Sequence, residues 1–180
     1  MPTPAPERIE TDRLVLRRPR LADAAAIFAR YASDPEVTRW VGWPRHTAVE
    51  QTEGFLGFAA DEWVRWPAGP YLIERREDAL LIGSTGFGFE SPWAAMTGYV
   101  LAKDAWGQGY ATESLRAIVE LAPGLGVRRL FAYCHAGHAA SAHVLDKGGF
   151  TREGILARHT IFPNSGDPEP ASVLLYARTW

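Results

Sequence analysis

Apolar residues recur along the chain with two spacings, one typical of helices and one typical of strands. Apolar positions three or four residues apart predict helices over residues 21–33, 47–66, 115–122 and 141–147. Short extended apolar runs predict strands over residues 13–17, 71–74, 80–89, 97–102, 130–135, 154–162 and 173–176. Thr47 and Glu50 have the spacing of a capping box, so we expect the second helix to begin there.

The order of these elements is strand, two helices, three strands, helix, strand, helix and two strands. No repeat, low-complexity block or linker interrupts this order, which favours one α+β domain over residues 9–180. Residues 1–8 include a proline-rich run, and we expect them to form a flexible lead-in. Residues 71–74 and 80–89 flank a charged turn, which predicts a hairpin.

A loop of small residues, Trp106–Thr112, joins the strand over 97–102 to the following helix. Backbone N–H groups at such a helix start are unpaired and lie at the positive end of the helix dipole, so they can bind a phosphate. The alternative is an ordinary glycine turn. A dinucleotide-binding protein is disfavoured, because Thr112 replaces the third glycine of that fingerprint, and Arg128 and Arg129 stand where it has an acid.

A second group of segments extends this pattern. The strand over 130–135 is followed by the helix over 141–147, which ends at Gly148-Gly149-Phe150. With the loop, these segments resemble the GNAT superfamily of N-acetyltransferases over roughly residues 8–178. Trp106, the Cys134-His135 pair, Glu153-Gly154 and the run His159–Asn164 are similar to its RimJ/RimL branch. The resemblance implies a mixed central sheet of about seven strands with helices on both faces, in which two parallel strands splay apart around the cofactor.

The resemblance also implies that acetyl-CoA is the co-substrate. The loop would hold its phosphates through backbone N–H groups of Gly107, Gln108, Gly109, Tyr110, Ala111 and Thr112. The backbone of Val100, Leu101 and Ala102 would pair with the pantetheine amides like an added strand, and one N–H there would polarise the thioester carbonyl. His138 replaces the family's asparagine and can still donate a hydrogen bond to the cofactor.

The catalytic side chains differ from the family pattern more than the cofactor loop does. Ser141 matches the family's serine, and its hydroxyl is a candidate to protonate the leaving thiolate. The alternative is that Ser141 only caps the helix. The tyrosine acid of many relatives is replaced by Leu145, and the branch's Arg-Asp pair in the last loop is replaced by Pro170 and Ala171.

The group that takes the proton from the amine is also altered. Many relatives carry a glutamate where this chain has Met96, which cannot accept a proton. Glu90, His135 or a chain of water molecules are the candidates for this role. A histidine titrates near neutral pH, but a structural role for His135 at a strand end is the alternative, and Glu90 can equally be a solvated turn residue.

Trp40 and Trp43 lie in the loop that borders the acceptor groove in relatives. Arg39, Arg45 and His46 flank them. This loop is either a wall of the acceptor site or plain loop packing.

Composition narrows the classes of partner. The 180-residue chain has a formal net charge of -2, which gives no electrostatic case for nucleic acid or an anionic membrane. No apolar run approaches the ~20 residues of a membrane span, and no signal region begins the chain, so a cytoplasmic protein is expected. The single cysteine, Cys134, excludes an internal disulfide and is expected to be a buried structural thiol. No residue spacing indicates a metal site.

These patterns predict an enzyme that transfers the acetyl group of acetyl-CoA directly to a primary amine in a ternary complex. The acceptor is either a protein N-terminus or a small amine. A non-catalytic acyl-CoA-binding sensor or interaction module is the alternative, which Met96, His138 and Ala171 keep open. Both a monomer and a homodimer fit, since an exposed last strand would offer an edge for pairing.

Overall fold

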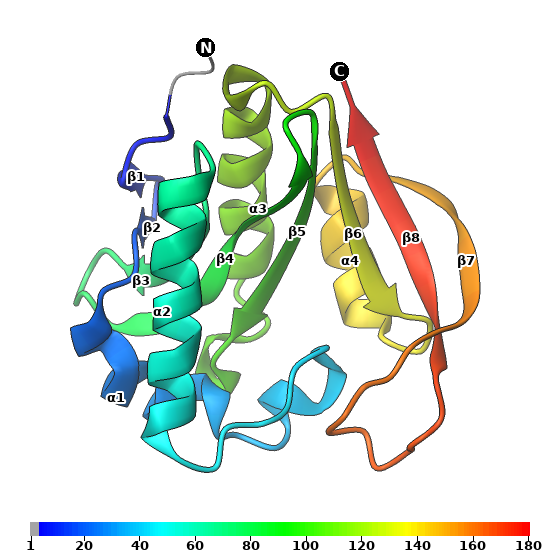
Figure 1. Cartoon of the computed structure of the whole chain (residues 1–180), viewed down its shortest axis with the longest axis horizontal. Coiled ribbons are helices and arrows are strands. Elements are labelled where there is room, and N and C mark those ends of the chain that lie inside the picture. Colours follow the sequence, from blue (N-terminus) through cyan, green and yellow to red (C-terminus); the bar gives the residue numbers. More distant parts are fainter. Residues whose placement is uncertain (1–3) are drawn as a thin grey trace.

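The computed structural model describes residues 4–180, which form one eight-stranded sheet with helices around it (Figure 1). The strands are β1 (Arg8–Glu10), β2 (Leu14–Arg17), β3 (Pro70–Arg75), β4 (Leu81–Ser91), β5 (Ala94–Leu101), β6 (Arg129–His135), β7 (Thr151–Thr160) and β8 (Ala171–Thr179). Their spatial order is β1-β2-β3-β4-β5-β6-β8-β7, and only the β5–β6 pair is parallel. The predicted mixed sheet is confirmed, with β1 as an additional strand.

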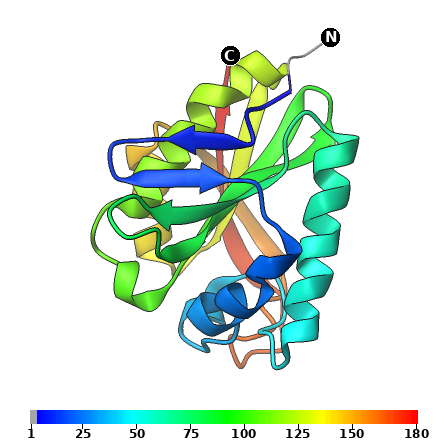
Figure 2. The same cartoon turned by 90° about the vertical axis from the view of Figure 1, so that its left-hand side faces the viewer.

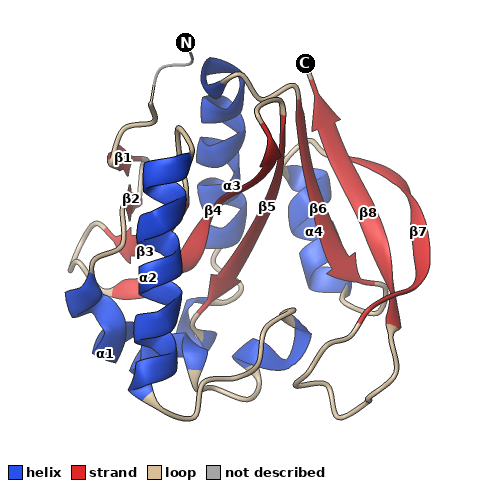
Figure 3. Ribbon diagram, in the orientation of Figure 1, coloured by secondary structure: helices blue, strands red, loops and turns tan. Residues whose placement is uncertain are grey.

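Helices cover both faces of the sheet (Figures 2 and 3). The helices are α1 (Ala24–Ile27), α2 (Val49–Arg65), α3 (Tyr110–Leu121) and α4 (Ala139–Lys147). α1 and α2 lie on one face, and α3 and α4 lie on the other (Figure 3). The layered α+β architecture therefore agrees with the sequence pattern.

Each face of the sheet has its own apolar core. On one face, Leu115 and Ile118 of α3 are fully buried in a cluster with Leu130 of β6. On the other face, Ile27 of α1 and Leu56 of α2 pack in a second cluster. The predicted apolar face of α3 is confirmed, and burial of these side chains holds α3 in place against the sheet.

The segment predicted as one helix over 21–33 is irregular. A 3₁₀ turn (Leu21–Asp23), α1 and a π-helical segment (Phe28–Ala32) follow one another. The backbone N–H of Ser33 donates to the carbonyl of Phe28 at 3.2 Å, and its hydroxyl donates to the same carbonyl at 2.8 Å. These two bonds stabilise the wider final turn.

The start of α2 also differs from the prediction. Its N-cap is Ala48, so the helix begins two residues after Thr47. Oε1 of Gln51 accepts the backbone N–H groups of Thr47 (2.6 Å) and Ala48 (3.2 Å). Gln51 therefore performs the function that we assigned to Glu50.

The two ends of the chain pack differently from the expectation. Within the expected lead-in, Ala5 is buried and donates its N–H to the carbonyl of Pro67 at 2.7 Å, and Arg8 begins β1. Residues 1–3 of that segment lie outside the described residues. At the other end, β8 lies between β6 and β7, so the expectation that the last strand forms an exposed edge is wrong, and β7 forms that edge.

The parallel strands β5 and β6 separate soon after they begin. They pair only at Ala94↔Arg129, Ala95↔Leu130 and Met96↔Phe131. Beyond these pairs, β5 stays paired with β4 and β6 stays paired with β8, so the two strands diverge toward their C-terminal ends (Figure 1). The strand separation expected from the family resemblance is therefore present.

Candidate active site

A groove with a volume of about 1110 Å³ occupies the gap between β5 and β6. Its walls come from segments that lie far apart in the sequence: the C-terminal halves of β5 and β6, the loop before α3, α4, and residues 36–43. Because the site is open on the inner edge of both strands, their backbone groups as well as side chains can contact a ligand.

Only alternate residues of β5 turn their backbone toward this groove. In an antiparallel pair, the N–H and C=O groups of successive residues point to opposite sides of the strand. Ala102 donates its N–H to the carbonyl of Ile82 at 2.8 Å, on the β4 side. Val100, two residues earlier, has the same orientation, whereas Tyr99 and Leu101 face the groove. Of the predicted Val100, Leu101 and Ala102, Leu101 therefore turns its backbone toward the groove, as its neighbour Tyr99 does. Val100 also lines the groove, whereas Ala102 does not.

The loop before α3 carries a series of free donors. The backbone N–H groups of residues 107–112 donate no hydrogen bond within residues 4–180. Gly107 and Gly109 have φ angles of +72° and +81°, which side chains other than glycine rarely adopt. Gly109 is the N-cap of α3, so the helix dipole adds partial positive charge at this point. This arrangement is that of an anion site.

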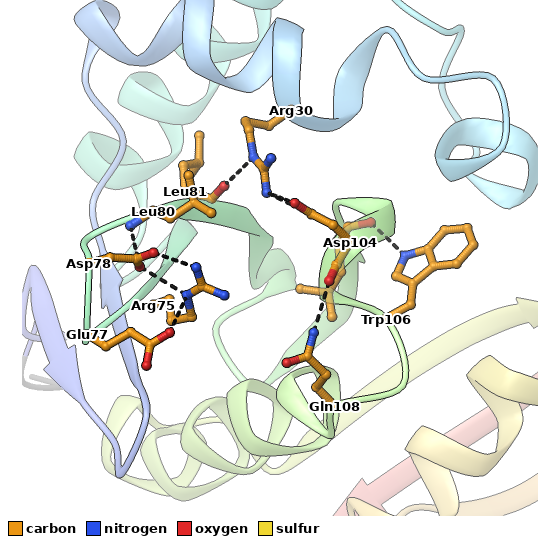
Figure 4. Close-up of polar contacts among 10 residues, drawn as sticks. Arg30, Arg75, Glu77, Asp78, Leu80, Leu81, Asp104, Trp106 and Gln108 are labelled. Carbon is orange, nitrogen blue, oxygen red and sulfur yellow. Dashed lines mark hydrogen bonds and ion pairs between the residues drawn. The ribbon is translucent and has the colours of Figure 1, made fainter.

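Side-chain hydrogen bonds fix the chain between β5 and this loop (Figure 4). Nη2 of Arg30 contacts both carboxylate oxygens of Asp104, at 2.8 and 3.0 Å. Nε2 of Gln108 donates to the carbonyl of Asp104 at 2.9 Å, and Nε1 of Trp106 donates to the carbonyl of Leu101 at 2.9 Å. The indole thus occupies the Leu101 carbonyl and leaves the Leu101 N–H free. The side-chain amide of Gln108 is engaged by this bond to Asp104, and Gln108 is not among the groove-lining residues.

Arg13, in the turn between β1 and β2, ties that turn to the loop. Its Nη1 donates to the carbonyl of Gln108 at 2.8 Å, and its guanidinium carbon lies 4.6 Å from the ring centroid of Tyr110. Its Nε donates to Glu113 at 2.7 Å, and Thr11 Oγ1 donates to the same carboxylate at 2.6 Å. Burial alone raises the pKa of Glu113, but the hydrogen bonds from Thr11 and Arg13 outweigh it and lower that pKa. The ionised carboxylate therefore holds Arg13 in place.

Ser141, in the first turn of α4, is tied to β5 by Tyr99. The Tyr99 Oη lies 2.9 Å from both the carbonyl and the Oγ of Ser141. The phenol has one proton, so when it donates to the carbonyl it can accept a hydrogen bond from the Ser141 hydroxyl. Burial raises the pKa of Tyr99, which keeps the phenol protonated. Cys134, which also lines the groove, is a free buried thiol as predicted, and burial raises its pKa.

Two histidines of the groove use Nδ1 as a hydrogen-bond acceptor. His138 is the N-cap of α4, and its Nδ1 accepts the backbone N–H of Ser141 at 3.4 Å, so His138 rather than Ser141 caps the helix. Burial, and then the nearby His135, lower the pKa of His138. Nδ1 of His135 accepts the N–H of Gly137 at 2.9 Å. Neutral His135 then carries its proton on Nε2, which suits a hydrogen-bond donor better than a general base.

The other two residues considered for the proton-acceptor position lie in different places. Met96 lines the groove at the last paired position of β5 and is 43% exposed. Glu90 is exposed near the end of β4 and is not among the groove-lining residues. β4 carries Glu90 past the pair of Gly88 with Met96, toward the turn and away from the open end of the gap. The structure therefore brings Met96 to the site but not Glu90.

Trp40 and Trp43 both line the groove, and Trp40 is the centre of a stack of side chains. Its ring lies 4.2 Å from that of His135, with an interplanar angle of 30°. The guanidinium carbon of Arg39 lies 4.7 Å from the Trp40 ring centroid, and Phe162 meets that ring edge-on at 6.3 Å. The stack Arg39–Trp40–His135 thus joins the loop over 36–43 to the end of β6.

Asn164, in the loop between β7 and β8, holds the segment that carries this stack. Its Nδ2 donates to the carbonyls of Thr38 (2.8 Å) and Trp43 (2.9 Å). Its Oδ1 accepts the backbone N–H of Arg45 at 2.8 Å. The Asn164 amide thereby fixes residues 38–45 in one conformation.

Two further observations concern metal ligands and membrane-spanning helices. Within residues 4–180, no three His, Cys, Asp or Glu side chains are grouped so that they could hold a metal ion. In the same part of the chain, no helix is both long and apolar enough to cross a membrane.

Known proteins share this sequence and this fold. Residues 13–151 match the model of the acetyltransferase (GNAT) domain. YoaA of Bacillus subtilis (strain 168), an uncharacterized N-acetyltransferase, is 35% identical over 159 residues, which are 84% of this chain and 86% of that protein. The p20 protein of Bacillus licheniformis, also an uncharacterized N-acetyltransferase, is 29% identical over 153 residues, covering 83% of this chain and 85% of that protein.

Solved structures agree with these sequence matches. RimL, a ribosomal L7/L12 alpha-N-protein acetyltransferase solved in complex with coenzyme A, has a TM-score of 0.85 at 25% identity, covering 96% of this chain and 98% of that one. The microcin C7 self-immunity acetyltransferase MccE, solved with acetyl-CoA and AMP, has a TM-score of 0.85 at 19% identity, covering 98% of each chain. The chain therefore belongs to the GNAT acetyltransferase family, whose members acetylate amines with acetyl-CoA.

Three residues that organise the site had no predicted role. Asn164 stood in a segment that carried the resemblance, Tyr99 stood in the predicted strand over 97–102, and Arg13 stood at the start of another predicted strand. Their partners lie 42 to 126 residues away in the sequence, so no local pattern could reveal these contacts.

Replacing Asn164 with alanine should loosen residues 38–45 while leaving the sheet intact. The substitution removes three hydrogen bonds, each worth about 1 kcal/mol. We expect backbone amides of residues 38–45 to exchange with deuterium about tenfold faster or more. Ser165→Ala is the matched control, because Ser165 lies in the same loop but bonds only within it. Unchanged exchange over 38–45 in Asn164→Ala would show that Asn164 does not hold this segment.

Proposed function

We propose that the groove holds acetyl-CoA along β5, with its phosphates at the start of α3. The observation that carries this proposal is the end of β5–β6 pairing at Met96↔Phe131. Tyr99 and Leu101 then have free backbone groups for the pantetheine amides, in the manner of an added strand. Residues 107–112 have free N–H groups for the phosphates, and a side chain at Gly107 would meet nothing within 4 Å, so the backbone there is open to a ligand.

We propose direct transfer of the acetyl group to a primary amine in a ternary complex. When bound, acetyl-CoA supplies the thioester that the amine attacks and the thiolate that leaves. A covalent route would need a nucleophile on the protein, and Cys134 is poorly suited because its raised pKa keeps it a thiol. Holding both reactants together supplies much of the rate without such an intermediate.

The groups of this chain that assist the transfer are Tyr99 and Ser141. The backbone N–H of Tyr99 faces the groove and is the donor for the oxygen that gains negative charge in the transition state. The hydroxyl of Ser141 is the donor for the departing sulfur, and for this step the Tyr99 phenol, 2.9 Å away, donates its own proton to the Ser141 Oγ and so orients the hydroxyl. Tyr99 thus has two roles: its backbone N–H contacts the oxygen of the thioester carbonyl, and its side chain orients the hydroxyl that contacts the sulfur.

The acceptor arm of the groove is formed by residues 36–43 and by His135, which stacks on Trp40 of that segment. RimL acts on the N-terminus of a ribosomal protein, and this relation supports a protein N-terminus as acceptor, with a small amine as the other possibility. The rival function is a non-catalytic acyl-CoA sensor, which Met96 favours because it cannot take a proton from an amine. Binding of acetyl-CoA without release of coenzyme A in the presence of any amine would support the sensor.

Gly109→Glu should abolish acetyl-CoA binding while the protein stays folded. It places a carboxylate beside the free N–H groups that would hold the phosphates, so we expect the affinity measured by calorimetry to fall about 100-fold or more. Gly57→Glu is the control, because Gly57 is exposed in α2 with open space around it and lies outside the groove lining. A thermal unfolding curve verifies that each variant is folded. Unchanged affinity in folded Gly109→Glu would remove the proposed phosphate site.

Ser141→Ala should slow turnover more than it weakens acetyl-CoA binding. If the hydroxyl assists the leaving sulfur only in the transition state, kcat falls about tenfold or more while the KM for acetyl-CoA changes less than about twofold. Ser114→Ala is the control, because Ser114 is fully buried on α3, bonds only to the carbonyl of Ala111, and does not line the groove. A kcat for Ser141→Ala equal to that of Ser114→Ala would leave Ser141 with a structural role alone.

A further inference from the structure

Arg39 places an uncompensated positive charge on the acceptor arm. Among the described groove-lining residues it is the only arginine, and its side chain is exposed. It forms no ion pair with any carboxylate of residues 4–180. Its guanidinium instead lies over the face of Trp40, with the guanidinium carbon 4.7 Å from the ring centroid. This contact leaves the N–H groups at the edge of the guanidinium free to donate.

The carboxylates nearest to Arg39 in the sequence are engaged elsewhere. Glu36, which also lines the groove, contacts Nζ of Lys103 at 2.5 Å. Asp34 accepts the backbone N–H groups of Glu36 (2.8 Å) and Val37 (3.1 Å) through Oδ1. Glu36 is the N-cap of the 3₁₀ turn that contains Arg39, yet its carboxylate pairs with Lys103 and not with Arg39. The charge of Arg39 therefore has no partner on its own segment.

The platform beneath Arg39 is held in place from two directions. His135 stacks on Trp40 at 4.2 Å, and Asn164 bonds to the backbone on both sides of Trp40, at Thr38 and Trp43. A guanidinium that is already positioned loses less conformational entropy when it binds a ligand. Arg39 thus has three properties of a recognition group: a fixed support, free donors and a place in the groove.

We infer that the acceptor is a primary amine that also carries a carboxylate, and that Arg39 binds this carboxylate. The inference rests on the proposed function and specifies the substrate class of the same site. The planar fork of an arginine matches a carboxylate in geometry and charge. A polyamine or another polycation is disfavoured, because the one carboxylate among the described groove-lining residues, Glu36, already pairs with Lys103. The carboxylate belongs either to a free amino acid or to an acidic side chain of a peptide.

The test compares amines that differ only in this group. The wild-type protein, saturated with coenzyme A, is titrated with phenylalanine and with phenylalaninamide, and then with Ala-Glu and Ala-Gln peptides that carry a C-terminal amide. Equilibrium binding, read from tryptophan fluorescence, is the primary measurement, because a free carboxylate also changes the basicity of the amine. We expect the carboxylate member of at least one pair to bind about tenfold tighter or more. The pair that shows the preference identifies the source of the carboxylate.

Variants then assign the preference to Arg39. Arg39→Gln should remove the preference, and Arg39→Lys should restore part of it because it keeps the charge but not the fork. Arg65→Gln is the matched control: its guanidinium carbon lies 5.5 Å from the Trp66 ring centroid, and neither residue lines the groove. It should keep the full preference.

Three results would overturn the inference: equal or tighter binding of both amides, absence of binding by all four compounds, or a preference that survives in Arg39→Gln. Failure of the proposed function would be seen differently. Either the wild-type protein would not bind coenzyme A, or it would bind acetyl-CoA but transfer the acetyl group to no amine. Each failure is thus recognised from its own measurement.

Discussion

The separation of β5 from β6 after the Met96–Phe131 pair is the feature on which the site depends. A backbone N–H or C=O that loses its partner inside a protein is costly unless water or a ligand replaces that partner. Here each strand keeps its outer neighbour, β4 for β5 and β8 for β6, so only the inner edges are left open. Those edges face a groove of about 1110 Å³, where a ligand can reach them.

Polar side chains fix the segments around this opening. Arg13 joins the β1–β2 turn to the loop before α3, Tyr99 joins β5 to α4, and Asn164 joins the β7–β8 loop to residues 38–45. Each tie connects segments that lie far apart in the sequence on the border of the groove. A site assembled in this way is preorganised, so binding and catalysis need little rearrangement of the protein.

Local sequence patterns were sufficient for most of the fold and for only part of the site. The apolar face of α3, the β3–β4 hairpin and the glycine loop depend on residues close in sequence, so their periodicity predicts them. β1 spans only three residues, two of them charged, and gives no such signal. The choice between Val100 and Tyr99 as the residue facing the groove depends on the register with β4, and a shift of one residue reverses it. The roles of Arg13, Tyr99 and Asn164 arise from contacts between distant segments, which a single sequence does not reveal.

The most direct test of this site is an NMR titration of the ¹⁵N-labelled protein with acetyl-CoA, followed at backbone amides. We predict the largest chemical-shift changes at Tyr99, at Leu101 and at residues 107–112, with smaller changes at Val100 and Ala102, whose backbone faces β4. NAD added in place of acetyl-CoA should leave these amides unchanged. Saturable changes confined to other parts of the chain, or no change with acetyl-CoA, would contradict the assignment of the gap between β5 and β6 as the cofactor site.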